Sequence, residues 1–150
     1  MPHWFSDLYD SIDAMNLDAF AAGLAPDAEV IVGNNPPMQG REAAREGIGY
    51  FFSTIAGIKH NITNVVEGDG VTVMEARIDY TRKDGNTVTV PAVTILERRD
   101  NLVKSLRIYI DVAPVYAYRQ DANVTRPDEM IVSKAIVSSR MRSQIGPRLS

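Results

Sequence analysis

The stretch that decides the fold spans residues 71–81 and reads VTVMEARIDYT. Side chains alternate between the two faces of a β-strand, so a strand here has two faces of different chemistry. The mostly apolar face consists of Thr72, Met74, Ala76, Ile78 and Tyr80. The other face carries three charges, Glu75, Arg77 and Asp79. Buried charges are costly unless they are paired, so this face is either solvated or a paired network that lines a cavity.

The segments around this stretch predict an antiparallel meander of long strands. Strand character recurs at residues 59–67, 87–98 and 102–111. The turns between them are rich in Gly, Asp and Asn, and Lys83-Asp84-Gly85-Asn86 is a strong hairpin signal.

The first third of the chain predicts helices instead. Residues 3–15 place apolar side chains on one helical stripe and Asp7, Asp10 and Asp13 on the solvated side. Further helices are predicted at residues 18–24 and 41–55, with a short strand at 28–32 between them. Because helices come first and strands follow, we expect an α+β domain.

Composition excludes several classes of protein. The chain has 150 residues, a formal net charge of -3 and no cysteine. One domain with a real core is expected at this length, and the charge argues against a nucleic-acid partner. Disulfides, thiolate catalysis and cysteine-bound metals are excluded. The sequence has no apolar run of the ~20 residues that span a bilayer and no signal-peptide pattern near Met1, so we expect a soluble, cytoplasmic protein.

The C-terminal part has a different pattern, and we place the domain boundary between residues 1–116 and an extension at 117–150. A helix is predicted to begin near Pro127, and Arg140, Arg142 and Arg148 make its end basic. Two interpretations stay open. The extension packs on the body or on a neighbouring subunit, or it forms a lid over a pocket.

Three segments resemble the nuclear-transport-factor-2-like superfamily, which includes ketosteroid isomerase, SnoaL-type polyketide cyclases and limonene epoxide hydrolase. They are LAPDAEV at 24–30, GREA at 40–43 and LRIYID at 106–111. The resemblance spans about residues 4–116. It implies a cone-shaped α+β barrel in which N-terminal helices pack on a curved, mainly antiparallel sheet around an apolar pocket. It also implies a homodimer paired through the outer sheet face.

The resemblance also suggests catalytic residues. Arg77-Ile78-Asp79 resembles the Arg-x-Asp step of limonene epoxide hydrolase, and this turns the charged face toward the pocket. Asp79 is then the predicted acid or base, and Arg77 orients it and stabilises a developing oxyanion. His60 is a candidate proton shuttle, with a partly exposed strand-end histidine as the alternative. Asp111 is a candidate second acid, although a β-bulge is needed to turn it inward.

Other residues are candidates for binding a substrate. The predicted set combines aromatic, polar and apolar side chains: Trp4, Tyr9, Asn34, Tyr50, Phe51, Glu75 and Ile108. For the aromatic members, packing in the core is the alternative, and for Asn34 it is a role in shaping its loop. With only two histidines and no cluster of ligands, we expect no metal. The sequence also shows no nucleophile elbow and no phosphate-binding loop.

These observations lead to two hypotheses about function. The first is a cofactor-independent acid–base enzyme, an isomerase, cyclase or epoxide hydrolase, acting on a small apolar polyketide- or terpenoid-like metabolite. The second is a non-catalytic module of the same fold that binds a small molecule or dimerises. Both predict a homodimer without nucleic-acid or membrane partners.

Overall fold

The structure is a computed structural model, and it describes residues 2–117. The predicted C-terminal helix near Pro127 lies outside the described residues. The helices are α1 (His3–Asp13), α2 (Leu17–Ala22), α3 (Arg41–Ser53) and α4 (Ala113–Tyr116). The strands are β1 (Leu24–Val32), β2 (Met38–Gln39), β3 (Ile55–Gly68), β4 (Val71–Arg82), β5 (Thr87–Arg99) and β6 (Leu102–Ile110).

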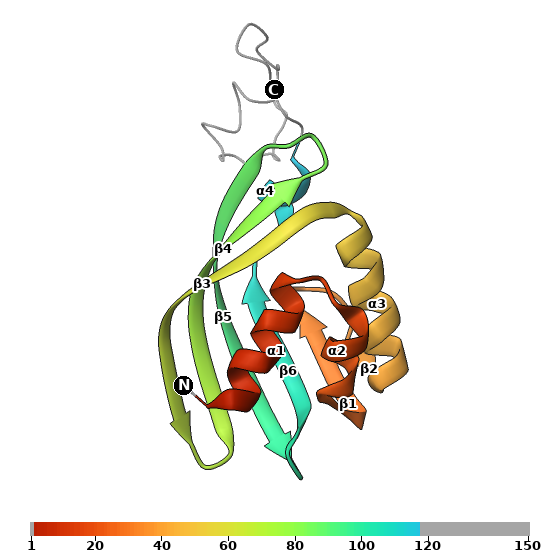
Figure 1. Ribbon diagram of the computed structural model, residues 1–150, viewed down its shortest axis with the longest axis vertical. Coiled ribbons are helices and arrows are strands. Elements are labelled where there is room, and N and C mark those ends of the chain that lie inside the picture. The colour runs from red at the N-terminus through yellow and green to blue at the C-terminus, as the bar shows by residue number, and fades with distance from the viewer. Residues whose placement is uncertain (1, 118–150) are drawn as a thin grey trace, which may run out of the picture. The chain divides into compact units, whose positions relative to one another are not determined.

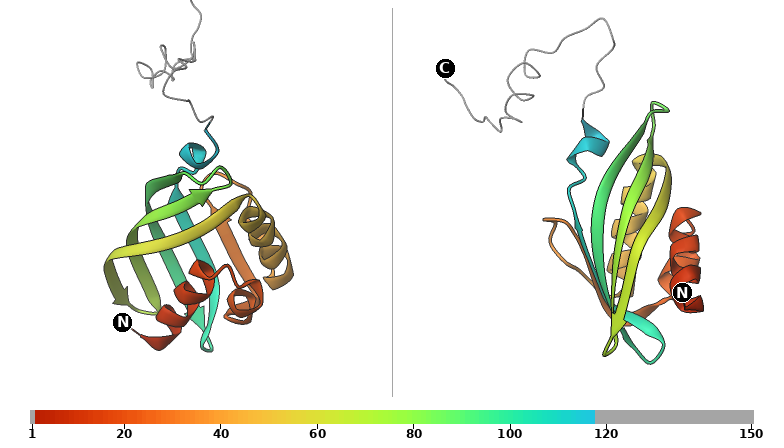
Figure 2. Two further views of the ribbon diagram at one scale, coloured as in Figure 1. Left: turned by 45° about the horizontal axis from the view of Figure 1, so that its top comes forward. Right: turned by 90° about the vertical axis from the view of Figure 1, so that its left-hand side faces the viewer.

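The strands form one curved sheet in the order β2-β1-β6-β5-β4-β3 (Figure 1). β1 and β6 are parallel, and every other neighbouring pair is antiparallel. The sheet is not closed, so β2 and β3 are its edges. Helices α1, α2 and α3 lie against one face of the sheet (Figure 2). The predicted α+β class, with N-terminal helices on a curved and mainly antiparallel sheet, is confirmed.

The predicted hairpins are confirmed, and their turn residues explain them. Between β3 and β4, Asp69 and Gly70 have φ values of 52° and 77°. Gly85 between β4 and β5 has a φ of 89°, and the Asn86 backbone N–H donates to Asp84 Oδ1 at 2.9 Å. Positive φ at two adjacent residues suits the twist of the tight β3–β4 hairpin, whereas the β4–β5 turn has positive φ at Gly85 alone among its residues.

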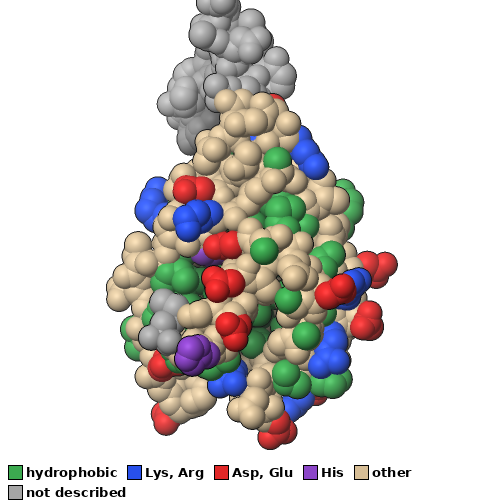
Figure 3. Space-filling model, viewed as in Figure 1, with side chains coloured by type: hydrophobic (Ala, Val, Ile, Leu, Met, Phe, Trp, Pro, Cys, Tyr) green, Lys and Arg blue, Asp and Glu red, His purple; other side chains and the backbone are tan. Residues whose placement is uncertain are grey.

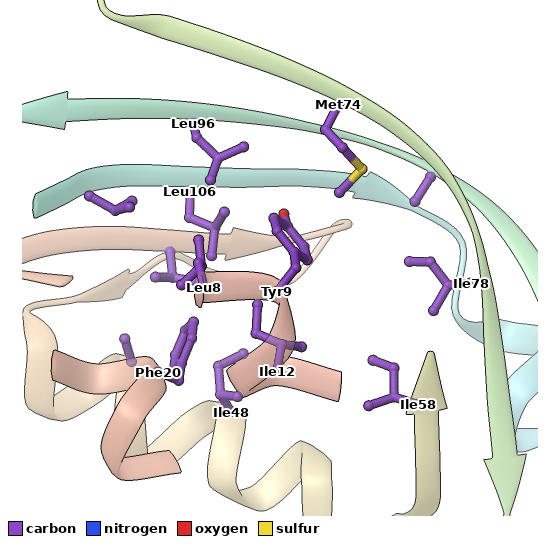
Figure 4. Packing of buried hydrophobic residues seen from close by; sticks show 14 of the residues in the cluster. Leu8, Tyr9, Ile12, Phe20, Ile48, Ile58, Met74, Ile78, Leu96 and Leu106 are labelled. Carbon is purple, nitrogen blue, oxygen red and sulfur yellow. The ribbon is translucent and has the colours of Figure 1, made fainter. Parts of the chain in front are cut away.

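The core lies between the helices and the curved sheet. The predicted apolar stripe of α1 is buried at Phe5, Leu8, Tyr9 and Ile12. Leu8, Tyr9 and Ile12 point toward the sheet that carries Leu96, Leu106 and Met74 (Figure 4). A row of acidic side chains covers the outer side of α1 (Figure 3). Within residues 2–117, no helix is long and apolar enough to cross a membrane.

Several boundaries differ from the predicted ones because strand pairing overrides local pattern. α3 ends at Ser53, and β3 begins at Ile55, whose side chain is buried. Ile55 pairs with Arg82 of β4. β1 likewise begins at Leu24, which pairs with Val103 of β6. Those partners are distant in sequence, so helical or strand periodicity alone did not reveal them.

Candidate active site

The charged side chains of β4 do not line a pocket, contrary to the sequence prediction. Met74, Ala76, Ile78 and Tyr80 are buried toward the helices, whereas Glu75 and Arg77 are exposed and Asp79 is half-exposed. A strand turns alternate side chains to opposite faces. Because the apolar set fills the core, the charged set must lie on the outer face of the sheet.

Asp79 belongs to a polar ladder across the outer face of β3, β4 and β5. Thr89 Oγ1 donates to Asp79 Oδ1 at 2.5 Å, and Asn61 Nδ2 donates to Asp79 Oδ2 at 2.9 Å. These two hydrogen bonds, the one from Thr89 first, hold the pKa of Asp79 below its usual value. Thr63 Oγ1 donates to Glu75 Oε1 at 3.1 Å in the same ladder. The contacts are those of cross-strand pairs that stabilise a sheet.

A cavity of about 50 Å³ lies instead between the inner face of the sheet and the helices. Its walls are mainly aliphatic and aromatic side chains from α1, α2, α3 and all the long strands. Four of the lining residues carry polar groups: Tyr9, His60, Tyr80 and Thr94. The site is therefore an apolar chamber with a few polar groups, which is the usual chemistry of a small-molecule site.

Among the residues that line the cavity, His60 is paired with a carboxylate, that of Asp13. Its Nδ1 lies 2.6 Å from Oδ1 of Asp13, and its backbone N–H donates to both carboxylate oxygens at 3.2 and 3.1 Å. The His60 side chain is only 8% exposed. A carboxylate only accepts hydrogen bonds, so Nδ1 carries the proton. The other ring nitrogen, Nε2, has no hydrogen-bond partner among residues 2–117.

Two tyrosines add neutral hydroxyl groups to the cavity. The Tyr9 ring packs edge-on against the His60 ring with 4.8 Å between centroids. Burial raises the pKa of Tyr9 well above its usual value, an effect that the Thr94 side chain partly opposes. Burial likewise raises the pKa of Tyr80. Both phenols therefore stay protonated at neutral pH and are available as hydrogen-bond donors.

Four predicted residues meet at this cavity: Tyr9, Phe51, His60 and Ile108. The others lie elsewhere. Trp4 lines a separate hollow, where the Arg98 guanidinium lies 4.3 Å from its ring centroid.

Tyr50 is exposed on α3 and lines the neighbouring hollow instead of this cavity. The last two predictions concern loop positions. Asn34 is exposed in the loop before β2 and lines neither this cavity nor the neighbouring hollow. Asp111 is exposed just after β6, where its Oδ1 accepts from the Ala113 backbone N–H at 2.9 Å. The β5–β6 register runs without a bulge from Ser105 to Ile110, so nothing turns Asp111 inward.

Sequence reasoning missed Asp13, Tyr80 and Thr94. Asp13 was assigned to the solvated side of its helix, although its place in the helix indicates that it has a partner elsewhere. It is the last residue of α1, where the helix dipole disfavours a negative charge, and a carboxylate there suggests a partner outside the helix. Tyr80 and Thr94 lie on inner faces of their strands, which alternation from Ile78 and Ala92 would have indicated.

No metal centre is evident in the part of the chain that the structure describes. Residues 2–117 contain no group of three or more His, Asp or Glu side chains arranged to hold an ion. The polar groups that line the cavity are the imidazole of His60 and the hydroxyl groups of Tyr9, Tyr80 and Thr94.

Comparison with known proteins identifies the family. Residues 5–106 match the SnoaL-like domain, and the chain belongs to this family. A search of the curated proteins gave no match. The resemblance to the nuclear-transport-factor-2-like superfamily is thus confirmed.

Solved structures with the same fold include both enzymes and proteins of unknown activity. A hypothetical protein with a ketosteroid isomerase-like fold from Catenulispora acidiphila is 20% identical, with a TM-score of 0.72 over 84% of this chain and 99% of that one. A putative SnoaL-like polyketide cyclase from a Jannaschia species is 22% identical, with a TM-score of 0.66 over 75% and 86%. An LEH-like epoxide hydrolase from M. tuberculosis is 13% identical, with a TM-score of 0.65 over 75% and 84%. At these identities the likeness supports the fold alone.

Proposed function

We propose that this protein is an acid–base enzyme in which His60 transfers a proton to or from a small, mostly apolar substrate. The observation that carries the proposal is that His60, which lines the apolar cavity, is paired with Asp13. A carboxylate at Nδ1 fixes the tautomer and the orientation of the ring, and so prepares Nε2 as a base. Asp13 is a positioning residue in this scheme, since it acts through His60.

The simplest reaction begins next to a carbonyl group. Nε2 of His60 removes a proton from the adjacent carbon, the C–H electron pair forms a C=C bond, and the carbonyl π electrons move to oxygen. In a substrate with a C=C bond next to that carbon, the imidazolium returns the proton to the far end of the dienolate, which is isomerisation. In cyclisation the enolate carbon instead bonds to a second carbonyl carbon, whose π electrons move to oxygen and take the proton from the imidazolium. For an epoxide, Nε2 removes a proton from water as the water oxygen bonds to a ring carbon. The C–O bond of that carbon breaks, and the imidazolium gives the proton to the oxygen that leaves.

Polyketide- and terpenoid-like molecules remain the proposed substrates. The apolar walls suit such compounds, and structures of similar fold are described as a polyketide cyclase and an epoxide hydrolase. The proposed enzyme needs no cofactor, because each step above uses only the proton of His60 and the electrons of the substrate.

The test is exchange of deuterium from D₂O into the carbons beside the carbonyl of 4-phenylcyclohexanone, followed by proton NMR with the full chain. His60→Gln should lower the exchange rate by about 10²–10⁴-fold, the usual contribution of a general acid or base. Asp13→Asn should lower kcat by about 10–100-fold and leave KM unchanged, because it removes only the group that orients the histidine.

Asp10→Asn is the matched control, since Asp10 is an exposed carboxylate one turn earlier on α1. It should exchange at the wild-type rate. Exchange at the wild-type rate in His60→Gln would contradict the enzyme proposal. The second hypothesis, a module that binds apolar molecules without turning them over, would then remain.

A further inference from the structure

The volume of the cavity beside His60 limits what it holds. It measures about 50 Å³, whereas an engineered cavity that binds benzene has about 150 Å³ and ligand pockets have about 300–1,000 Å³. A ring system of the size expected for the substrate does not fit there. Only one end of such a molecule reaches His60.

A second hollow provides the missing space. It measures about 340 Å³ and lies between the loop before β2, helix α3 and helix α4. Val32, Ile48 and Phe51 line both this outer hollow and the inner cavity. The two spaces are therefore neighbours separated by the side chains of these three residues.

Phe51 is the aromatic member of this partition. Its ring makes an edge contact with Tyr80, an inner-cavity residue, with 5.8 Å between centroids and 85° between planes. The side chain is half-buried and turns about only two torsions, so a change of its rotamer would alter the wall between the two spaces.

The lining residues describe the ligand. Among residues 2–117, no Asp, Glu, Lys or Arg lines either space. The Tyr116 hydroxyl is within 2.8 Å of Thr54 Oγ1, and Asn35 Nδ2 donates to the Val32 carbonyl at 3.0 Å, so these polar groups of the outer hollow have partners already. An uncharged, apolar body suits the outer hollow, and a polar end suits the inner one.

We propose that the site takes an elongated, uncharged ligand of two or more rings, or an equivalent chain. Its apolar body occupies the outer hollow, and one carbonyl or hydroxyl end passes Phe51 to reach His60. Phe51 is then the residue that determines which molecules enter. This inference rests on the proposed function, because it identifies the substrate class of the same site.

Binding of two phenols tests the inference without turnover. The probes are phenol and 4-phenylphenol, titrated into the full chain and followed by NMR. 4-Phenylphenol should shift the Gly47 amide in the outer hollow and the His60 ring signals in the inner cavity together. Its Kd should be lower than that of phenol by about tenfold or more, because a second ring is buried.

Variants of Phe51 test the partition. Phe51→Trp should weaken binding of 4-phenylphenol by about tenfold or more, since overfilling a packed site is unfavourable. Phe51→Leu places a smaller side chain between the two spaces, with little risk to folding. It leaves more room for the ligand to pass and should strengthen binding. Val66→Trp is the control, because Val66 is exposed on β3 and lines neither space. Circular dichroism confirms that each variant is folded.

Three results would overturn the inference: shifts confined to one of the two spaces, wild-type affinity in Phe51→Trp, or no binding of either phenol. Failure of the proposed function gives a different pattern. If 4-phenylphenol occupies both spaces while His60→Gln exchanges deuterium normally, the catalytic proposal fails and the two-chamber site stands.

Discussion

At the scale of single residues, the candidate site depends on a carboxylate in an unfavourable place. Asp13 ends α1, where the unpaired carbonyl groups of the helix repel a negative charge. The His60 backbone N–H and ring nitrogen offset that repulsion by direct hydrogen bonds. The same contacts join α1 to β3, so the pair positions an element as well as a side chain.

The buried tyrosines predict a loss of stability in alkali. The pKa values of Tyr9 and Tyr80 are raised in the folded state by burial, whereas an unfolded phenol titrates near pH 10. Above about pH 10 the unfolded state therefore loses its protons first, and the free energy of unfolding falls as pH rises. Urea unfolding from about pH 9 to 11.5 measures this slope.

Removing either phenol hydroxyl should make that slope shallower. Tyr9→Phe and Tyr80→Phe are the test variants, and Tyr109→Phe, which removes an exposed hydroxyl, is the control. Identical slopes in wild type, Tyr9→Phe and Tyr80→Phe would mean that neither phenol is linked to unfolding.

At the scale of elements, β4 shows how one strand separates two kinds of chemistry. Its inner face contributes Ile78 and Tyr80 to the cavity, and its outer face contributes Asp79 to the polar ladder. Neighbouring residues on this strand thus have unrelated roles. Charge density along a strand is consequently a weak indicator of a catalytic site, because the outer face of a sheet is where cross-strand polar pairs are common.

Asp79→Asn should leave deuterium exchange unchanged and lower stability near neutral pH. The folded-state pKa of Asp79 is lowered by the hydrogen bonds from Thr89 and Asn61. A lowered pKa contributes stability above the unfolded value of about 3.9, and this contribution is lost as pH falls through the folded-state pKa.

Thermal unfolding of the wild type and Asp79→Asn therefore gives Tm values that differ near neutral pH and converge in acid. His60→Gln is the comparison for activity. If Asp79→Asn lost exchange as His60→Gln is expected to, the assignment of Asp79 to a structural ladder would be wrong.

At the scale of the whole molecule, the two faces of the sheet have different surroundings. The inner face meets the helices and forms the cavity, whereas the outer face of β5 and β6 presents apolar side chains to solvent. Val93 and Tyr109 lie opposite each other in register and are 37% and 58% exposed. The resemblance to the superfamily predicts a homodimer paired through this face, and these two residues are suited to its centre.

A dimer of this kind should dissociate when a charge is placed on the face. Light scattering coupled to size exclusion should give a dimer for the wild type and a monomer for Tyr109→Glu, because an unpaired charge is costly in an apolar contact. Tyr50→Glu, at an exposed position of α3, is the control and should remain dimeric. A monomeric wild type, or a dimeric Tyr109→Glu, would contradict this arrangement.

The sequence by itself determined the class of fold and most of its elements. The stripe of α1, the alternation of β4 and the turns at Gly70 and Gly85 are local patterns, and each acts on residues close along the chain. Local patterns sufficed for the α+β class and the hairpins. The resemblance of three segments to a known superfamily indicated the family and made His60, Tyr9, Phe51 and Ile108 candidates.

Only the tertiary structure decided which residues meet. Asp13 and His60 are 47 positions apart, and their contact depends on how α1 lies across the curved sheet. The inward face of β4 was likewise settled by the position of the helices, which bury Ile78 and leave Asp79 outside. Periodicity shows that a strand has two faces, but which face becomes the core is decided by the element that packs against it.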